Sequence, residues 1–202
     1  MKMPIFPELL FDEYQHIYTI NGAQLPSVTT IMQPLKNAYY GGIDDGIMAV
    51  AAKRGKTVHQ SIENYLKFGI DDLPPEHEGY YQAFKMWLTD KKPTTLEAES
   101  KVYHKTLRYA GTADLPCIIK DTLMCVDFKT TASIAGMLTR VQLEAYAKAY
   151  ESHGVKFGGK AIVQLTKEGT YKMESYAPRD TEAWETFTSL LAIHNYMKKY
   201  GR

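Results

Sequence analysis

Two stretches in the middle of the chain bring acidic and basic side chains to spacings that suit metal-assisted hydrolysis. They are residues 111–114, Gly-Thr-Ala-Asp, and residues 126–131, Val-Asp-Phe-Lys-Thr-Thr. Side chains alternate along a β-strand, so Asp127 and Lys129 are expected on one face, about 6.5–7 Å apart. Asp114 ends the preceding predicted strand, and a meander would bring it beside Asp127.

Two carboxylates that converge with one ammonium group are a costly arrangement unless a cation balances them. Mg²⁺ takes oxygen ligands and usually keeps several waters, so it would suit such a place. Lys129 would then hold or deprotonate an attacking water and stabilise negative charge that develops on a phosphate. By itself an Asp-x-Lys pair has a plainer reading, an ion pair on an exposed strand beside an unrelated turn aspartate.

The elements that must position these residues follow from hydrophobic periodicity and turn signals. The first 40 residues or so predict an extension, with a hairpin over 8–20, an Asn21-Gly22 turn and a short helix over 28–34 capped by Ser27. After it we expect an α/β or α+β layout, with a central mixed sheet flanked by helices. In chain order we predict helices over 44–68 and 76–90, strands over 95–104, 108–119 and 122–129, a helix over 136–152, strands over 158–166 and 170–177, and a helix from Asp180 to about residue 200.

Length and composition exclude several classes of protein. A chain of 202 residues suits one domain, here 1–202, and the net charge of +1 excludes a globally basic nucleic-acid binder but not a local basic patch. Two cysteines are too few for a disulfide framework, a four-cysteine zinc site or a four-cysteine iron–sulfur cluster. No apolar run could span a membrane and no signal-peptide core is present, so a cytoplasmic protein is expected.

Four short motifs, in a fixed order, carry a resemblance to a known family. They are Gly55-x-x-x-His59, Gly111-Thr112-x-Asp114, Asp127-x-Lys129 and Gln142-x-x-x-Tyr146. In this order they resemble the PD-(D/E)XK nuclease superfamily, specifically its RecB-like and phage-exonuclease branch. The segment 25–30, Leu-Pro-Ser-Val-Thr-Thr, also resembles phage members, so the resemblance covers about residues 25–150. The proline that often precedes the first aspartate is replaced by alanine, as in many members.

The resemblance implies a restriction-endonuclease-like core and a role for each motif. Asp114 and Asp127 would ligate Mg²⁺ or Mn²⁺ together with the main-chain carbonyl of Phe128, and Lys129 would position the water. His59 would be a further ligand or a neighbour of the metal, and imidazole suits Mn²⁺ better than Mg²⁺. On the helix that follows, Gln142 and Tyr146 would face the cleft and contact DNA or brace the site.

Four further residues are candidates for the same site. Glu99, on one face of the predicted strand over 95–104, is either a second-metal ligand or an exposed strand carboxylate. Glu63 follows His59 by one helical turn and is either a substrate contact or a solvated glutamate. Arg54, in a basic cluster with its neighbours, and Thr130, directly after the Asp-x-Lys pair, are assigned to substrate binding.

Together these features predict a metal-dependent deoxyribonuclease. The absence of a helicase P-loop motif favours a stand-alone enzyme, and by analogy a phage or prophage exonuclease that acts on double-stranded ends or single strands in the host cytoplasm. A single-strand annealing partner and a ring-shaped homo-oligomer are implied by that analogy alone. The alternative is a catalytically silent nucleic-acid-binding module on the same fold. It predicts loss of an acidic or lysine position, and none is lost here.

Overall fold

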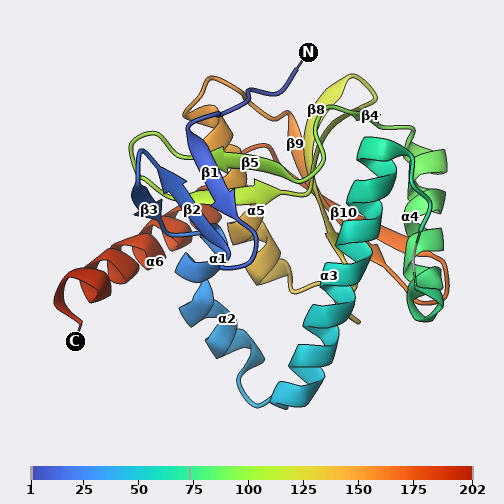
Figure 1. Cartoon of the computed structure of the whole chain (residues 1–202), viewed down its shortest axis with the longest axis horizontal. Helices are drawn as coiled ribbons and strands as arrows, with labels where there is room; N and C mark the ends of the chain where they lie inside the picture. Colours follow the sequence, from blue (N-terminus) through green and yellow to red (C-terminus); the bar gives the residue numbers. More distant parts are fainter. Residues whose placement is uncertain (1, 73, 202) are drawn as a thin grey trace.

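The computed structural model describes residues 2–72 and 74–201, and a five-stranded mixed sheet lies at its centre (Figure 1). Only one neighbouring pair of strands in this sheet is parallel, and the helix that connects the pair provides the crossover that parallel strands require. The fold is therefore mixed α/β, as predicted. In spatial order the strands are β10 (Tyr171–Tyr176), β9 (Gly159–Leu165), β8 (Thr122–Lys129), β7 (Leu115–Ile119) and β4 (Thr94–Thr95), and α5 (Gly136–Glu151) links β8 to β9.

Helices cover both faces of the sheet and bury two separate cores. On one side α3 (Asp45–Phe68) and α4 (Glu78–Lys91), the latter preceded by the 3-10 turn η1 (Pro75–His77), pack over Val126 and Phe128. On the other side α5 and α6 (Thr181–Tyr200) enclose the second core. Among the described residues, no helix combines the length and apolar character needed to cross a membrane. Side chains alternate along β8. Because Val126 and Phe128 face α3 and α4, Asp127 and Lys129 face the α5 side.

The N-terminal segment forms its own small sheet beside the main one. Asn21 and Gly22 have φ values of 51° and 77°, as a tight type I′ turn requires, and the predicted turn lies there. Ser27 caps the next helix by accepting a hydrogen bond from the Thr30 amide at 3.0 Å. The elements are β1 (Leu9–Asp12), β2 (Ile17–Ile20), β3 (Ala23–Leu25), α1 (Val28–Ile31) and α2 (Gln33–Tyr40).

Two predicted elements are wrong in a way that matters for the site. The single strand expected over 95–104 is divided into β4 and β5 (Ser100–Tyr103), which belong to different sheets. The strand expected over 108–119 is divided at Asp114 into β6 (Ala110–Ala113) and β7, and β6 pairs with β5. Side-chain alternation continues through both breaks, so the pattern did not show that the chain changes sheets.

The short helix expected over 28–34 was also wrong in its extent. The helix there ends at Ile31, and Pro34 lies in the first turn of a second helix, where its missing N–H costs no hydrogen bond. The two cysteines are buried in the neighbouring strands β7 and β8. The second helix, α2, forms one wall of the cleft described below.

Candidate active site

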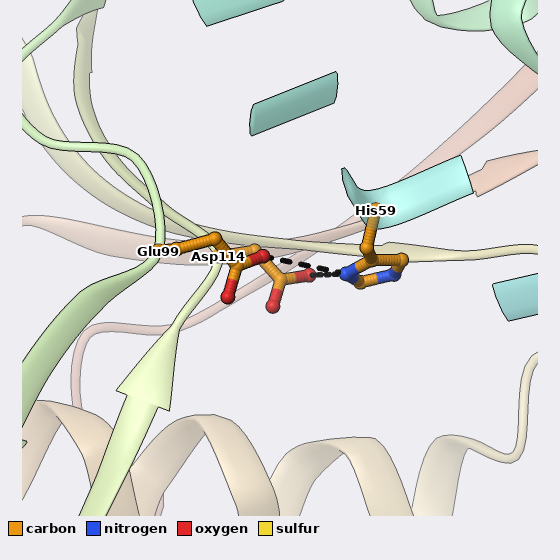
Figure 2. A group of neighbouring side chains, drawn as sticks. All are labelled: His59, Glu99 and Asp114. Atoms are coloured by element: carbon orange, nitrogen blue, oxygen red, sulfur yellow. Dashed lines mark ion pairs between the residues drawn. The ribbon is translucent and has the colours of Figure 1, made fainter. Parts of the chain in front are cut away.

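Three side chains from distant parts of the chain meet where the chain passes from β6 to β7 (Figure 2). His59 Nδ1 lies 3.5 Å from Asp114 Oδ2 and 3.6 Å from Glu99 Oε1. One ligand atom from each residue lies within 4.8 Å of the others, a grouping that suits a metal ion. On the other side of the ring, His59 Nε2 lies 3.0 Å from the Phe128 carbonyl oxygen. The structure therefore groups three of the five predicted ligand residues, and it places the Phe128 carbonyl at the opposite ring nitrogen of His59.

Backbone hydrogen bonds fasten this group to the sheet. Asp114 lies where the chain passes from β6 to β7, and its Oδ2 accepts a hydrogen bond from the Phe128 amide at 2.8 Å. The Glu99 amide donates to the Asp114 carbonyl at 2.8 Å. The prediction that Glu99 lies on a strand is wrong. Glu99 lies in a bend before β5, with φ at +50°. The two breaks in the predicted strands therefore place the two acids beside each other.

Asp127 and Lys129 form the second part of the site, on the same face of β8 as predicted. Lys129 Nζ lies 2.7 Å from Asp127 Oδ2 and donates to Gln142 Oε1 at 3.3 Å, and Gln142 Nε2 donates to Tyr146 Oη at 3.2 Å. Asp127 is only 1% exposed; its Oδ2 faces the Lys129 ammonium group, and its Oδ1 has no hydrogen-bond partner within the described chain. A buried carboxylate with open acceptor positions is costly, so this one is suited to a cation.

The electrostatics of the group reflect an excess of acids in a poorly solvated place. Burial, then the charge of Asp127, raises the pKa of Asp114 to about 7, against the opposing effect of His59. Burial lowers the pKa of His59, but Asp114 and Glu99 outweigh it and bring that pKa to about 9. The metal-free site therefore holds protons near neutral pH where a cation would otherwise balance the carboxylates.

A close contact joins the motif around Gly111 to the motif on α5. A Cβ at Gly111 would lie 2.6 Å from Cε1 of Tyr146 and 3.3 Å from Cγ2 of Val28. Only glycine leaves room for the ring, whose hydroxyl accepts the hydrogen bond from Gln142. The spacing of these two motifs therefore reflects packing as well as chemistry.

A cleft of about 760 Å³ runs between α2 and α3 beside this site. Glu99, Asp114 and Asp127 are not among the residues that line it, and neither is Tyr146, which was expected to face it. His59, Lys129, Thr130 and Gln142 line its inner end. Its outer wall on α2 was missed by the sequence reasoning, although the spacing of polar and aromatic residues over 33–40 is helical. The α2 residues are Gln33, Lys36, Asn37 and Tyr40.

The remaining predicted contacts lie at different distances from the cleft. Arg54 Nη2 donates to the Thr130 carbonyl at 3.0 Å, which links α3 to the end of β8. Thr130 itself lines the cleft. Glu63 forms an ion pair with Lys67 at 2.6 Å along α3 and is not among the residues that line the cleft.

Comparisons with known proteins leave the family of this chain open. No protein-family model matches it, and no curated protein matches it. Among solved structures, SSO0001 is 15% identical with a TM-score of 0.45, over 86% of this chain and 80% of that one. The alkaline exonuclease LHK-Exo from Laribacter hongkongensis is 9% identical with a TM-score of 0.39, over 68% of this chain and 76% of that one. Its complex with dAMP gives 13% identity and a TM-score of 0.34, over 73% and 90%. Similarities this low do not assign an activity.

Proposed function

We propose that this protein is a divalent-metal-dependent nuclease that hydrolyses phosphodiester bonds in DNA. The observation that carries the proposal is the charged group next to the inner end of the cleft, which His59 and Lys129 of this group line. Asp127 is buried with its Oδ1 unpartnered, Lys129 is 2.7 Å from its Oδ2, and the cluster of His59, Glu99 and Asp114 lies alongside. Carboxylates, an imidazole and one ammonium group around a cleft are the donor set expected for metal-assisted phosphate chemistry.

The donor set fits a divalent cation. Asp114, Glu99, Asp127 and the Phe128 carbonyl offer oxygen atoms, and His59 offers a nitrogen that Mn²⁺ accepts more readily than Mg²⁺ does. Such a cation would supply Lewis acidity and positive charge to a phosphate in the cleft. We assign the ligand role to these five residues, with Mg²⁺ or Mn²⁺ as the metal.

The chain's own groups would orient the reactants. Lys129 presents an ammonium group held between Asp127 and Gln142, so it can hold a water molecule and counter the charge that develops on a phosphate. Tyr146 holds the Gln142 amide, which fixes the oxygen that faces Lys129. Arg54 holds Thr130, the first residue after β8, against α3. A shift of this network would misplace the ammonium group and reduce the rate.

The type of nuclease and its biological role are inferred from the ordered motifs at residues 55–59, 111–114, 127–129 and 142–146. They support a stand-alone exonuclease of phage or prophage origin that acts at DNA ends in recombination or repair. By the same resemblance its products would carry 5′-phosphates, and a single-strand annealing protein and further copies of the chain would be its partners. A requirement for a free DNA end is the property that separates this assignment from an endonuclease.

The test is cleavage of linear duplex, circular duplex and single-stranded DNA in Mg²⁺, Mn²⁺ or EDTA. We expect degradation of linear DNA only with a metal, and a loss of about 100-fold or more in Lys129→Ala, on the scale of removing one charge-stabilising group. Glu63→Gln is the matched control and should keep full activity, because Glu63 does not line the cleft. DNA binding without cleavage under every metal condition would instead identify a silent binding module.

A further inference from the structure

The chain leaves the main sheet directly after Lys129, and its next two carbonyl groups accept hydrogen bonds from side chains of other elements. The pairing of β8 with β9 ends at Lys129 and Gln164. Gln164 Nε2 donates to the Thr131 carbonyl at 2.8 Å, and Arg54 Nη2 donates to the Thr130 carbonyl at 3.0 Å. Residues from β9 and α3 therefore hold two consecutive peptide groups at the end of β8.

Gln164 is a polar side chain at a buried position of β9, with 6% of its surface exposed. Paired residues of neighbouring strands point to the same face of a sheet, so Gln164 lies on the face of Lys129. Ile162, two residues earlier on that face, is buried, so an apolar side chain suits this side of β9. Burying an amide is costly unless it is hydrogen-bonded, and the Thr131 carbonyl supplies that bond. The amide at position 164 is thus explained by the segment that it holds.

The held segment connects the proposed catalytic lysine to an exposed bend. Ala132 and Ser133 are exposed, and α5 begins only at Gly136. Solvent-exposed segments with few packing contacts open more easily than the strands that they follow. Movement of this bend would pass back along the main chain to Lys129, whose Nζ lies 2.7 Å from Asp127 Oδ2. The two side-chain hydrogen bonds separate the lysine from that movement.

We propose that Gln164 is a positioning residue for hydrolysis. Its hydrogen bond to the Thr131 carbonyl keeps the end of β8, and with it the Lys129 ammonium group, in place beside Asp127. Arg54 acts on the adjacent carbonyl from α3. Gln164 does not line the cleft, so it acts through the main chain and not on the substrate. This inference rests on the nuclease proposed above and adds a residue outside the four sequence motifs.

The first test is steady-state cleavage of linear DNA in Mn²⁺ by wild type and by Gln164→Met, which keeps the size of the side chain and removes its donor. We expect kcat to fall about tenfold or more, the scale of a small misplacement of a catalytic group, with KM unchanged within about twofold. Gln164→Asn keeps the amide but is one methylene too short for the carbonyl, so it should show the same loss.

Ser152→Ala is the matched control, because Ser152 also holds main-chain groups by its side chain. It accepts from the Lys105 amide at 3.2 Å and donates to the Ala149 carbonyl at 2.7 Å, at the C-terminal end of α5. Thermal unfolding measures the stability that each variant loses. Ser152→Ala should lose stability and keep the kcat of wild type.

The second test is hydrogen–deuterium exchange of the metal-free protein, which needs no cleavage. Amides of residues 130–135 should exchange faster in Gln164→Met than in wild type, and at the rate of wild type in Ser152→Ala. A double variant with Arg54→Met should lose less kcat than the product of the two single losses, because either change already frees the same segment.

A Gln164→Met variant that cleaves with the kcat of wild type would overturn this inference and leave the nuclease proposal in place. Equal losses of kcat in Gln164→Met and Ser152→Ala would overturn it too, because lost stability would then explain both. A wild-type protein that cleaves DNA with no metal ion would overturn the nuclease proposal. Faster exchange confined to residues 130–135 in Gln164→Met would still show that Gln164 holds the end of β8.

Discussion

Replacing Glu99 with glycine should stabilise the metal-free protein while removing much of its response to a divalent cation. Glu99 has φ at +50°, a left-handed conformation that costs a residue with a Cβ about 1–2 kcal/mol and costs glycine little. Its carboxylate lies close to that of Asp114, which it repels. The favourable contact that would be lost is the pairing with His59 at 3.6 Å, between side chains that are 25% and 26% exposed. A pair so exposed contributes about 0–1 kcal/mol.

The balance of these effects is a gain of about 1 kcal/mol in the free energy of unfolding without metal, a strain relief of about 1–2 kcal/mol less a lost pair of about 0–1 kcal/mol. For a chain of this size that gain raises the melting temperature by about 2–4 °C. Thermal unfolding followed by circular dichroism, in EDTA and in excess Mn²⁺, measures both effects. In wild type Mn²⁺ should raise the melting temperature because it binds the native state, and in Glu99→Gly that rise should shrink.

Glu97→Gly is the matched control, because Glu97 lies two residues away outside the left-handed region and should lose about 0.5–1 kcal/mol. A Glu99→Gly variant that is less stable than wild type in EDTA would show that the residue is a structural ion-pair partner. A variant that keeps the full Mn²⁺-induced rise would show that Glu99 is not a ligand. Either result would show that Glu99 is not a strained residue held in place to bind a metal ion.

Three other predictions test the charge balance and the packing of the site and the core. In EDTA, the free energy of unfolding should fall as pH rises between 3.8 and about 9. The pKa values of Asp114 and His59 are raised in the native state to about 7 and about 9, so the native state binds more protons than the unfolded state across that window. Urea unfolding at successive pH values measures this fall, which should shrink in Asp114→Asn, and an unchanged slope in that variant would contradict it. Gly111→Ala should cost about 1–3 kcal/mol by overpacking the α5 tyrosine ring, whereas Gly136→Ala, with no atom within 4 Å of its Cβ, should be neutral or stabilising, and similar values for the two would argue against the contact. Lys160→Met should cost about 3–5 kcal/mol, because it leaves a buried glutamate of α5 without its partner, and a loss below 1 kcal/mol in the same assay would count against that buried pair.

Much of the scaffold was predictable because it depends on local patterns. Period-two alternation was sufficient to predict that Asp127 and Lys129 share a face of β8 while their apolar neighbours enter the core. Helical periodicity predicted α3, the helix that brings His59 to the sheet. Turn chemistry predicted the Asn21-Gly22 turn. In each case the signal and the structure lie within a few residues of each other.

The parts that were missed depend on contacts between distant segments. Nothing in residues 95–104 shows that the strand is divided, because the change of sheet depends on pairing with residues far along the chain, Pro116 and Ala113 among them. The sequence shows a glycine at position 111 but not why glycine is required there. The ring that leaves no room for a Cβ belongs to Tyr146, 35 positions later in the chain. The cleft wall on α2 was missed because the helix expected over 28–34 stops short of the residues that form it, and Pro34 lies in the first turn of α2.

We propose that residues from α3, β8 and the two breaks on either side of the β5–β6 hairpin gather around one divalent cation. A crystal structure of the protein soaked in Mn²⁺, with anomalous diffraction data, tests it most directly. We predict an anomalous peak at about 2.0–2.3 Å from oxygens of Asp114 and at least one of Glu99 and Asp127, at the inner end of the cleft. Mn²⁺ bound elsewhere, or the carboxylates of Asp114 and Asp127 unmoved and without a peak at saturating metal, would contradict the account.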